Sequence, residues 1–147
     1  MRIAIALMLS ALLLSGCEQP EFYDTEGKGY RFADLRGKYL IVNYWATWCG
    51  PCIKEIPELN ELADTHRDRL TVWGVNFDEP EGDEMRAQVS KMKITFPVFS
   101  ANPSAQLGVE TPQVLPTTLI FDPAGKLLKT LVGPQTEASL LAQLDSN

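Results

Sequence analysis

The sequence predicts a single α/β domain in which a mixed central sheet has helices on both faces. Three observations support this fold class. A continuous run of β-favouring residues, Tyr39–Trp45, leads directly into an amphipathic helical pattern. A second such run, 70–77, is followed by another helical pattern. The chain closes with a strand, a turn, a strand and a helix, and this order of elements is typical of a mixed sheet.

The first elements follow from turn and periodicity signals in chain order. Residues 22–24 and 30–32 flank a glycine-rich turn, which favours an N-terminal β-hairpin. Tyr39–Trp45 is apolar on both faces of a strand, as expected for the centre of a sheet. Apolar residues then recur every three or four positions as far as His66, which predicts a helix, and Pro57 inside it should bend that helix.

The later elements are predicted in the same way. Residues 81–92 suit a second helix, 96–99 a short strand or extended segment, and 103–112 a loop. The remaining predicted elements are the strands Thr117–Phe121 and Leu127–Val132 and a helix that begins at Thr136.

Residues 1–16 have the features of a signal peptide. Arg2 gives a positive start, and the apolar run 3–14 is short for a membrane span. We therefore assign 22–147 to the folded domain and 17–21 to a short tether, with no further domain, because the 147-residue chain has room for one core.

The end of this leader, Leu-Ser-Gly-Cys at 14–17, resembles the lipobox of bacterial lipoproteins. The resemblance implies cleavage before Cys17, acylation of Cys17, and a protein anchored by lipid in the bacterial cell envelope, facing the periplasm or the extracytoplasmic side. The alternative is an ordinary cleavage site with an incidental Cys17.

Charge argues against a nucleic-acid partner. The chain carries a net charge of −6 at pH 7 and has no basic stripe, whereas nucleic-acid binding needs clustered Lys and Arg. The acidic stretch 78–84 fits a solvated loop that enters the first turn of a helix, with a partner-docking patch as the alternative.

Cys49 and Cys52 flank Gly50 and Pro51 at the predicted junction of strand and helix. A thiol reacts as the thiolate, and a free cysteine has a pKa of about 8.5. Because a helix N-terminus favours an anion, Cys49 is the expected nucleophile, and Cys52, one turn later, the more buried resolving thiol. Gly50 lets a substrate chain approach, and Pro51 suits the first helical turn, where a missing N–H costs nothing.

Other interpretations of this pair fit less well. A zinc site needs about two more Cys or His ligands, and the chain offers only His66, so no metal is expected. A purely structural disulfide that closes so short a loop would add little stability through chain entropy.

The stretch 45–52, Trp-Ala-Thr-Trp-Cys-Gly-Pro-Cys, resembles the active site of thioredoxin-fold proteins, and Pro57 matches their helix-kinking proline. The segment 114–118, Val-Leu-Pro-Thr-Thr, resembles their cis-proline loop. The resemblance implies a thioredoxin fold and a cis bond between Leu115 and Pro116 that helps to hold the substrate beside Cys49. The substrate-binding residues are then expected to be Trp48, Gly50, Pro51, Leu115 and Pro116.

Within this fold the chain is most similar to the membrane-associated TlpA/ResA-like branch. Asn43 stands where cytoplasmic thioredoxins carry a buried aspartate, and Glu55 matches an active-site glutamate of the branch. Glu55 lies one turn beyond Cys52 and is expected to exchange a proton with it, a solvated helix-face glutamate being the alternative. A peroxidase of the peroxiredoxin type is disfavoured, because Val42 and Ala46 replace the proline and threonine of its P-x-x-x-T-x-x-C motif.

These residues predict thiol-disulfide exchange with exported proteins. The Gly-Pro pair resembles that of thioredoxin and favours reduction, and the branch includes reductants of cytochrome c maturation. We expect no cofactor, because the chain has no nucleotide or flavin fingerprint; a membrane thiol donor is the usual electron source in the family. We also expect a monomer. An oxidase that uses the same residues, and a non-catalytic thiol-dependent binding or chaperone module, are the alternatives.

Overall fold

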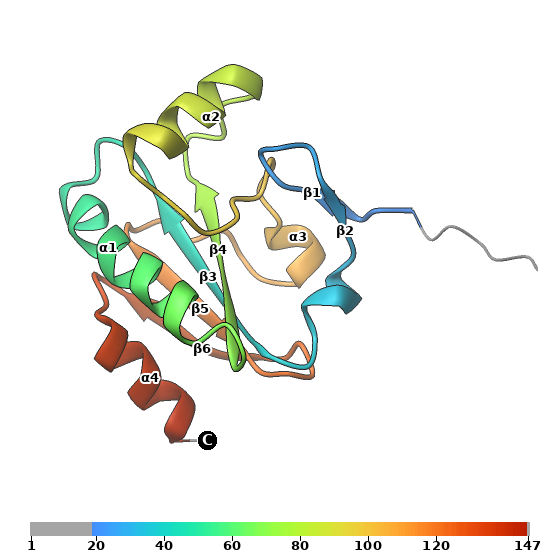
Figure 1. The fold of residues 1–147 in the computed structure, drawn as a ribbon, viewed down its shortest axis with the longest axis vertical. Coiled ribbons are helices and arrows are strands. Elements are labelled where there is room, and N and C mark those ends of the chain that lie inside the picture. The colour runs from blue at the N-terminus through green and yellow to red at the C-terminus, as the bar shows by residue number, and fades with distance from the viewer. Residues whose placement is uncertain (1–18, 147) are drawn as a thin grey trace, which may run out of the picture.

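The computed structural model describes residues 19–146, so Cys17 and the predicted signal peptide lie outside the described residues. It contains a four-stranded sheet in the order β4-β3-β5-β6, in which β3 is parallel to β4 and antiparallel to β5, and β5 is antiparallel to β6 (Figure 1). The predicted mixed sheet is confirmed. Its strands are β3 (Tyr39–Trp45), β4 (Leu70–Asn76), β5 (Thr117–Phe121) and β6 (Leu127–Val132).

Two apolar layers cover the two faces of this sheet. One face packs against α1 (Gly50–Thr65), α2 (Gly82–Lys91) and α4 (Glu137–Asp145). The other face packs against an antiparallel pair of short strands, a 3₁₀ helix and a short α-helix (Figure 1). These elements are β1 (Phe22–Tyr23), β2 (Gly29–Tyr30), η1 (Phe32–Leu35) and α3 (Ser104–Leu107). In residues 19–146 no helix combines the length and the apolar character that crossing a membrane requires.

The central strand β3 explains why its sequence is apolar without interruption. Ile41 and Trp45 point toward the α1 layer, whereas Val42 and Tyr44 belong to the opposite layer, and all four are fully buried. Side chains alternate along a strand, so a strand between two layers needs apolar residues at every position. Asn43 is the one polar residue in β3 and it faces α1.

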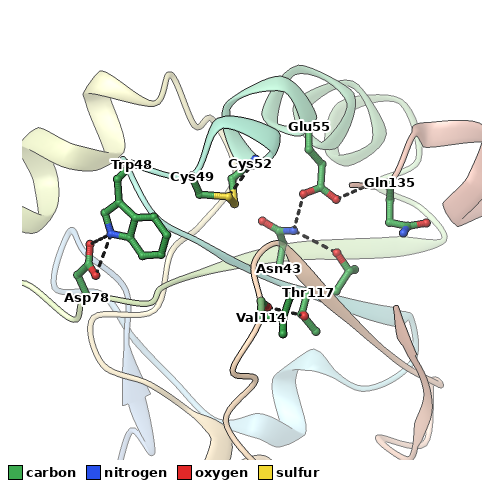
Figure 2. The surroundings of a disulfide bond; sticks show 10 residues. Asn43, Trp48, Cys49, Cys52, Glu55, Asp78, Val114, Thr117 and Gln135 are labelled. Carbon is green, nitrogen blue, oxygen red and sulfur yellow. Dashed lines mark hydrogen bonds between the residues drawn. A yellow bond between two sulfur atoms is a disulfide. The ribbon is translucent and has the colours of Figure 1, made fainter. Parts of the chain in front are cut away.

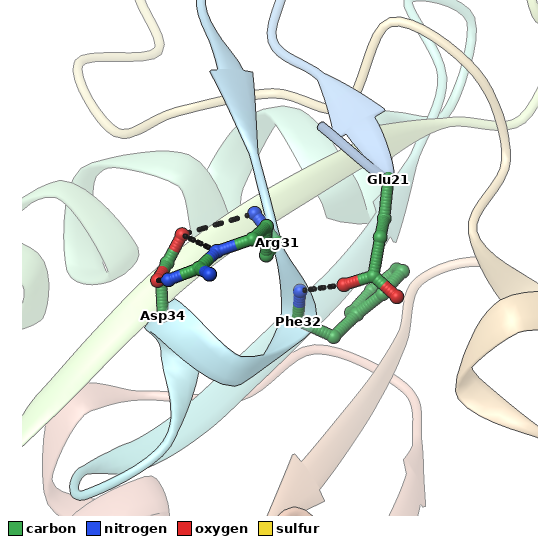
Figure 3. Close-up of polar contacts among 4 residues, drawn as sticks. All are labelled: Glu21, Arg31, Phe32 and Asp34. Atoms are coloured by element: carbon green, nitrogen blue, oxygen red, sulfur yellow. Dashed lines mark hydrogen bonds and ion pairs between the residues drawn. The ribbon is translucent and has the colours of Figure 1, made fainter. Parts of the chain in front are cut away.

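The N-terminal hairpin is confirmed, but both strands are shorter than predicted, and β1 ends at Tyr23. Its second strand was expected to run on to Phe32, but β2 ends at Tyr30. Phe32 instead begins η1, because its backbone N–H donates to Glu21 Oε2 at 2.8 Å (Figure 3). The Asp34 carboxylate accepts from the Arg31 backbone N–H at 3.1 Å and pairs with the Arg31 guanidinium at 2.7 Å. These polar contacts stabilise the turn at the point where strand pairing stops.

Two further predictions differ in detail. Part of the expected loop 103–112 forms the helix α3, which ends at Gly108 in the left-handed conformation. Segment 96–99 is extended, but its pairing is limited to isolated bridges of Val98 with Gly74 and of Phe99 with Asp24. A single helical turn has no apolar period, and a bridge depends on distant residues, so local patterns predict neither.

Gly74 in β4 is required by close packing, and Gly74→Ala is expected to lower the free energy of unfolding by about 1–3 kcal/mol. An added Cβ would lie 2.8 Å from Trp45 Nε1 and 3.1 Å from Val98 Cγ2, both in the buried core. Gly50→Ala is the matched control, because a Cβ at Gly50 has no neighbour within 4 Å. Urea denaturation of both variants measures the difference, and equal stabilities would contradict this account of Gly74.

Candidate active site

The two cysteines lie where β3 ends and α1 begins. A disulfide joins Cys49 and Cys52, whose Cα atoms are 5.2 Å apart (Figure 2). The Cys49 backbone N–H donates to the carbonyl of Ala46 at 3.2 Å, in the turn that leads from strand to helix. Cys52 is fully buried and Cys49 is 5% exposed, so the predicted difference in burial is present but small. Gly50 and Pro51 between them are exposed.

The N-terminus of α1 provides the electrostatic setting of Cys49. Cys49 is the N-cap residue, and its sulfur accepts a hydrogen bond from the Cys52 backbone N–H at 3.2 Å. Free N–H groups and the helix dipole stabilise negative charge at this position. Pro51 takes its predicted place in the first turn of α1. The geometry is therefore suited to a thiolate on Cys49 when the disulfide is open.

The Trp48 side chain is exposed beside the disulfide, whereas Trp45 is completely buried. The Trp48 side chain is 64% exposed, yet its Nε1–H donates to the Asp78 carboxylate at 2.9 Å (Figure 2). Its ring also meets Phe77 edge to face, with 6.4 Å between the centroids. The acidic stretch, predicted as a solvated loop, thus supplies a carboxylate that fixes Trp48 in place.

The predicted cis-proline loop lies at the start of β5. The Leu115–Pro116 bond is cis, which confirms the prediction. The Pro116 carbonyl accepts from the Gly133 backbone N–H at 2.9 Å, and the Thr117 hydroxyl donates to the carbonyl of Val114 at 2.7 Å. Leu115 packs against the apolar cluster that contains both cysteines. Figure 2 draws Val114 and Thr117 of this loop among the surroundings of the disulfide, and Val114 is 55% exposed.

Glu55 is buried one helical turn beyond Cys52, so the alternative of a solvated helix-face glutamate is wrong. Its Oε2 accepts from Asn43 Nδ2 at 3.1 Å, and its Oε1 accepts from the Gln135 backbone N–H at 2.9 Å (Figure 2). Burial raises the pKa of Glu55, and hydrogen bonds from Gln135, Asn43 and Thr118 oppose that rise. A buried carboxylate with a raised pKa beside a redox cysteine is suited to accept a proton.

Glu55→Gln is expected to change the pH dependence of stability. Because burial raises the pKa of Glu55 above its ordinary value of 4.5, the folded state disfavours the charged form. The resulting stability is fully present below 4.5 and is lost as the pH rises through the folded pKa. Relative to Glu55→Gln, the unchanged oxidised protein should therefore become more stable as the pH falls from neutrality. Urea denaturation over a pH series measures this, and a difference independent of pH would contradict it.

Several residues of this site come from distant parts of the chain and have no local signal in the sequence. Gln135, 80 residues from Glu55, contacts it from the loop before α4. Thr118 contacts Asn43 from β5 at 3.1 Å, and Asp78 contacts Trp48 from the loop after β4. Thr118 and Asp78 reach the site because the start of β5 and the end of β4 lie beside β3. Gln135 follows β6, which pairs with β5.

Comparison with known proteins indicates the same kind of protein as the cysteine pair does, a thiol-disulfide oxidoreductase. The model of the AhpC/TSA family matches residues 15–130. The chain is 34% identical over 128 residues to the thiol-disulfide oxidoreductase ResA of Bacillus cereus, and the match covers 85% of this chain and 73% of that protein. It is 33% identical over 131 residues to ResA of Bacillus subtilis (strain 168), over 85% of this chain and 71% of that protein.

Solved structures show the same fold. A DsbF homologue from Corynebacterium diphtheriae matches with a TM-score of 0.72 and 25% identity, over 90% of this chain and 96% of that one. The exposed lipoprotein thioredoxin Etrx1 of Streptococcus pneumoniae strain TIGR4 matches with a TM-score of 0.66 and 28% identity, over 86% of this chain and 97% of that one.

The comparisons and the cysteine pair agree on the chemistry. Val42 and Ala46 occupy the proline and threonine positions of the peroxidase motif, and both side chains are buried. Cys49 is bonded to Cys52 at the start of α1. The ResA relatives share about a third of their residues with this chain over most of its length. The chain therefore belongs to the AhpC/TSA family of thioredoxin-fold proteins and is a thiol-disulfide oxidoreductase.

Proposed function

We propose that this protein reduces disulfide bonds of exported proteins through a dithiol/disulfide cycle of Cys49 and Cys52. The observation that carries the proposal is the position of the Cys49 sulfur, at the N-terminus of α1 and in reach of the Cys52 N–H. This position favours the thiolate that attacks a substrate disulfide. The Gly-Pro pair between the cysteines resembles that of thioredoxin and supports reduction as the direction.

The exchange proceeds in two steps. The Cys49 thiolate attacks one sulfur of the substrate disulfide, so a mixed disulfide forms, the substrate S–S bond breaks and one substrate thiolate leaves. Cys52 then loses its proton and attacks the Cys49 sulfur. The Cys49–Cys52 bond closes, the second substrate thiolate leaves, and the substrate has gained two electrons.

Glu55 is the proposed proton acceptor for Cys52 in the second step. Cys52 and Glu55 are three residues apart on the buried face of α1, and both are at most 2% exposed. Water has little access to such a thiol, so a nearby carboxylate is needed to remove its proton. The raised pKa of Glu55 brings it closer to that of a thiol, which favours the transfer.

The substrate chain is proposed to lie across the exposed rim of the disulfide. Trp48 and Pro51 form one side of this rim, with Gly50 leaving room for a backbone. The loop of half-buried Leu115 and buried Pro116 is proposed to form the other side, where an extended substrate segment can pair with its backbone. Trp48, held by its hydrogen bond to Asp78, gives a rigid apolar contact, which lowers the entropy cost of binding.

The proposed location is the bacterial cell envelope, outside the cytoplasm, with a lipid on Cys17 as anchor. The lipobox-like sequence before Cys17 supports this, and one structural neighbour is an exposed lipoprotein thioredoxin. The proposed partners are protein disulfides, apocytochromes among them, and a membrane thiol protein that returns electrons to the Cys49–Cys52 pair. We further propose that the protein acts as a monomer.

A stoichiometric exchange assay tests this function. The reduced full chain with Cys17→Ser is mixed with a disulfide-containing protein such as insulin, and the thiols of both are quantified by mass after alkylation. We expect the substrate to gain two thiols as Cys49 and Cys52 lose theirs. Net transfer from substrate thiols to the oxidised chain would indicate an oxidase. Substrate binding that persists without both cysteines, with no exchange, would indicate a binding or chaperone module.

A further inference from the structure

Asn43 has one buried polar atom that the described structure leaves without a partner. The residue is fully buried in β3 and faces α1. Its Nδ2 donates to Glu55 Oε2 and to Thr118 Oγ1, each at 3.1 Å. Its Oδ1 accepts no hydrogen bond, although a buried carbonyl oxygen normally has a donor. Such an atom calls for an explanation.

The neighbours of Asn43 fix the orientation of its amide. Its Nδ2 donates to two oxygen atoms, Glu55 Oε2 and Thr118 Oγ1, so the donor end of Asn43 faces Glu55. The oxygen therefore points the other way, and Figure 2 shows it on the side of the Cys49–Cys52 disulfide. Cys52 and Glu55 lie one turn apart on the face of α1 that packs against β3. The Nδ2 end of the Asn43 amide thus faces Glu55, and the Oδ1 end lies on the side of Cys52.

The redox state of Cys52 decides whether the oxygen can find a donor. In the disulfide, the Cys52 sulfur carries no hydrogen. Reduction by two thiols of a donor protein breaks this S–S bond and forms one in the donor. Two electrons and one proton pass to this chain, leaving a thiolate on Cys49 and a thiol on Cys52, and the second proton goes to solvent. The Cys52 thiol is then an available S–H donor.

We propose that Asn43 is a positioning residue that raises the reduction potential of the pair by accepting a hydrogen bond from the Cys52 thiol in the reduced protein. The Nδ2 end keeps Glu55 in place, and the Oδ1 end is satisfied in the reduced state alone. This inference rests on the proposed dithiol cycle. Because the hydrogen bond exists in one redox state, it favours the reduced form and makes the protein a milder reductant.

The reduction potential of the Asn43→Leu variant tests the proposal. Leucine has a similar volume but no acceptor, so the pair should become more reducing, by about fivefold in the exchange equilibrium with glutathione or about 20 mV. Asn43→Ala should move the potential in the same direction and serves as a second variant if leucine disturbs the fold. The full chain with Cys17→Ser is the parent in each case.

Glu55→Ala provides the matched control, because Asn43→Leu also removes a donor from Glu55. In the Glu55→Ala background, Nδ2 keeps its hydrogen bond to Thr118 and the amide keeps its orientation. Asn43→Leu should therefore shift the potential by the same amount in this background. A shift that vanishes without Glu55 would mean that Asn43 acts only through the carboxylate, and the proposal would fail.

The S–H stretching band of Cys52 gives an independent test. With Cys17→Ser and Cys49→Ala, Cys52 is the only thiol in the chain. Its infrared S–H band should lie at lower frequency than that of a free thiol and should return toward the free value in Asn43→Leu. A band that Asn43→Leu leaves unchanged, or a potential that stays the same or rises, overturns the inference. Failure of the dithiol cycle on which the inference rests would differ, because the parent itself would not pass between dithiol and disulfide, and an oxidase would show itself by the direction of net transfer in the exchange assay.

Discussion

Cys49→Ser is expected to reduce the turnover of disulfide substrates to the uncatalysed rate. A serine hydroxyl is not ionised near neutral pH and cannot form the mixed disulfide through which exchange proceeds. The fold should remain, because serine fits the N-cap position of α1 and can accept from the same Cys52 N–H. The measurement is steady-state reduction of insulin with dithiothreitol as the electron source.

Cys17→Ser is the matched control for this substitution, because Cys17 lies outside the residues assigned to the exchange site. It should leave turnover unchanged in the same assay. Turnover that survives in Cys49→Ser would contradict the assignment of Cys49 as nucleophile and would transfer that role to Cys52.

Cys52→Ser is expected to stop turnover at a different point. In the Cys17→Ser background Cys49 can still attack, but the chain has no second thiol that could release the substrate, so the mixed disulfide accumulates. One substrate chain per protein should become attached through Cys49, and non-reducing electrophoresis with mass analysis detects it. The loss of turnover should match that of Cys49→Ser, whereas Cys49→Ser itself should attach no substrate.

The difference between the two variants shows which thiol attacks the substrate first. If Cys52→Ser attaches no substrate and Cys49→Ser does, the roles of the two thiols are reversed. That result would conflict with the burial of Cys52, which is fully enclosed at the third residue of α1.

The sequence predicts the elements that position the disulfide, because their signals are local. The apolar run of β3, the spacing of Cys49 and Cys52, and the periodicity of α1 lie within one continuous stretch. The closing strands β5 and β6 and the helix α4 also have the predicted bounds, with Thr136 as N-cap. A single-turn helix such as α3 has too few residues for any period to be visible.

The polar environment of the disulfide is less predictable, because it joins residues that are far apart in the chain. The spacing of Glu55 from Cys52 suits both a solvated and a buried carboxylate. The choice between them depends on Gln135 and Asn43, which lie on other elements and enclose the carboxyl group. Asp78 belongs to an acidic run that resembles an ordinary solvated loop, and its contact with Trp48 follows from the pairing of β4 with β3.

The reduction potential of the Cys49–Cys52 pair tests the central claim most directly. The full chain with Cys17→Ser is equilibrated with glutathione or dithiothreitol buffers, and the thiols of Cys49 and Cys52 are quantified. A reductant of exported proteins predicts a potential near that of thioredoxin, about −270 mV. A potential near about −120 mV, typical of strong oxidants, would contradict the proposed direction and identify the protein as a disulfide donor.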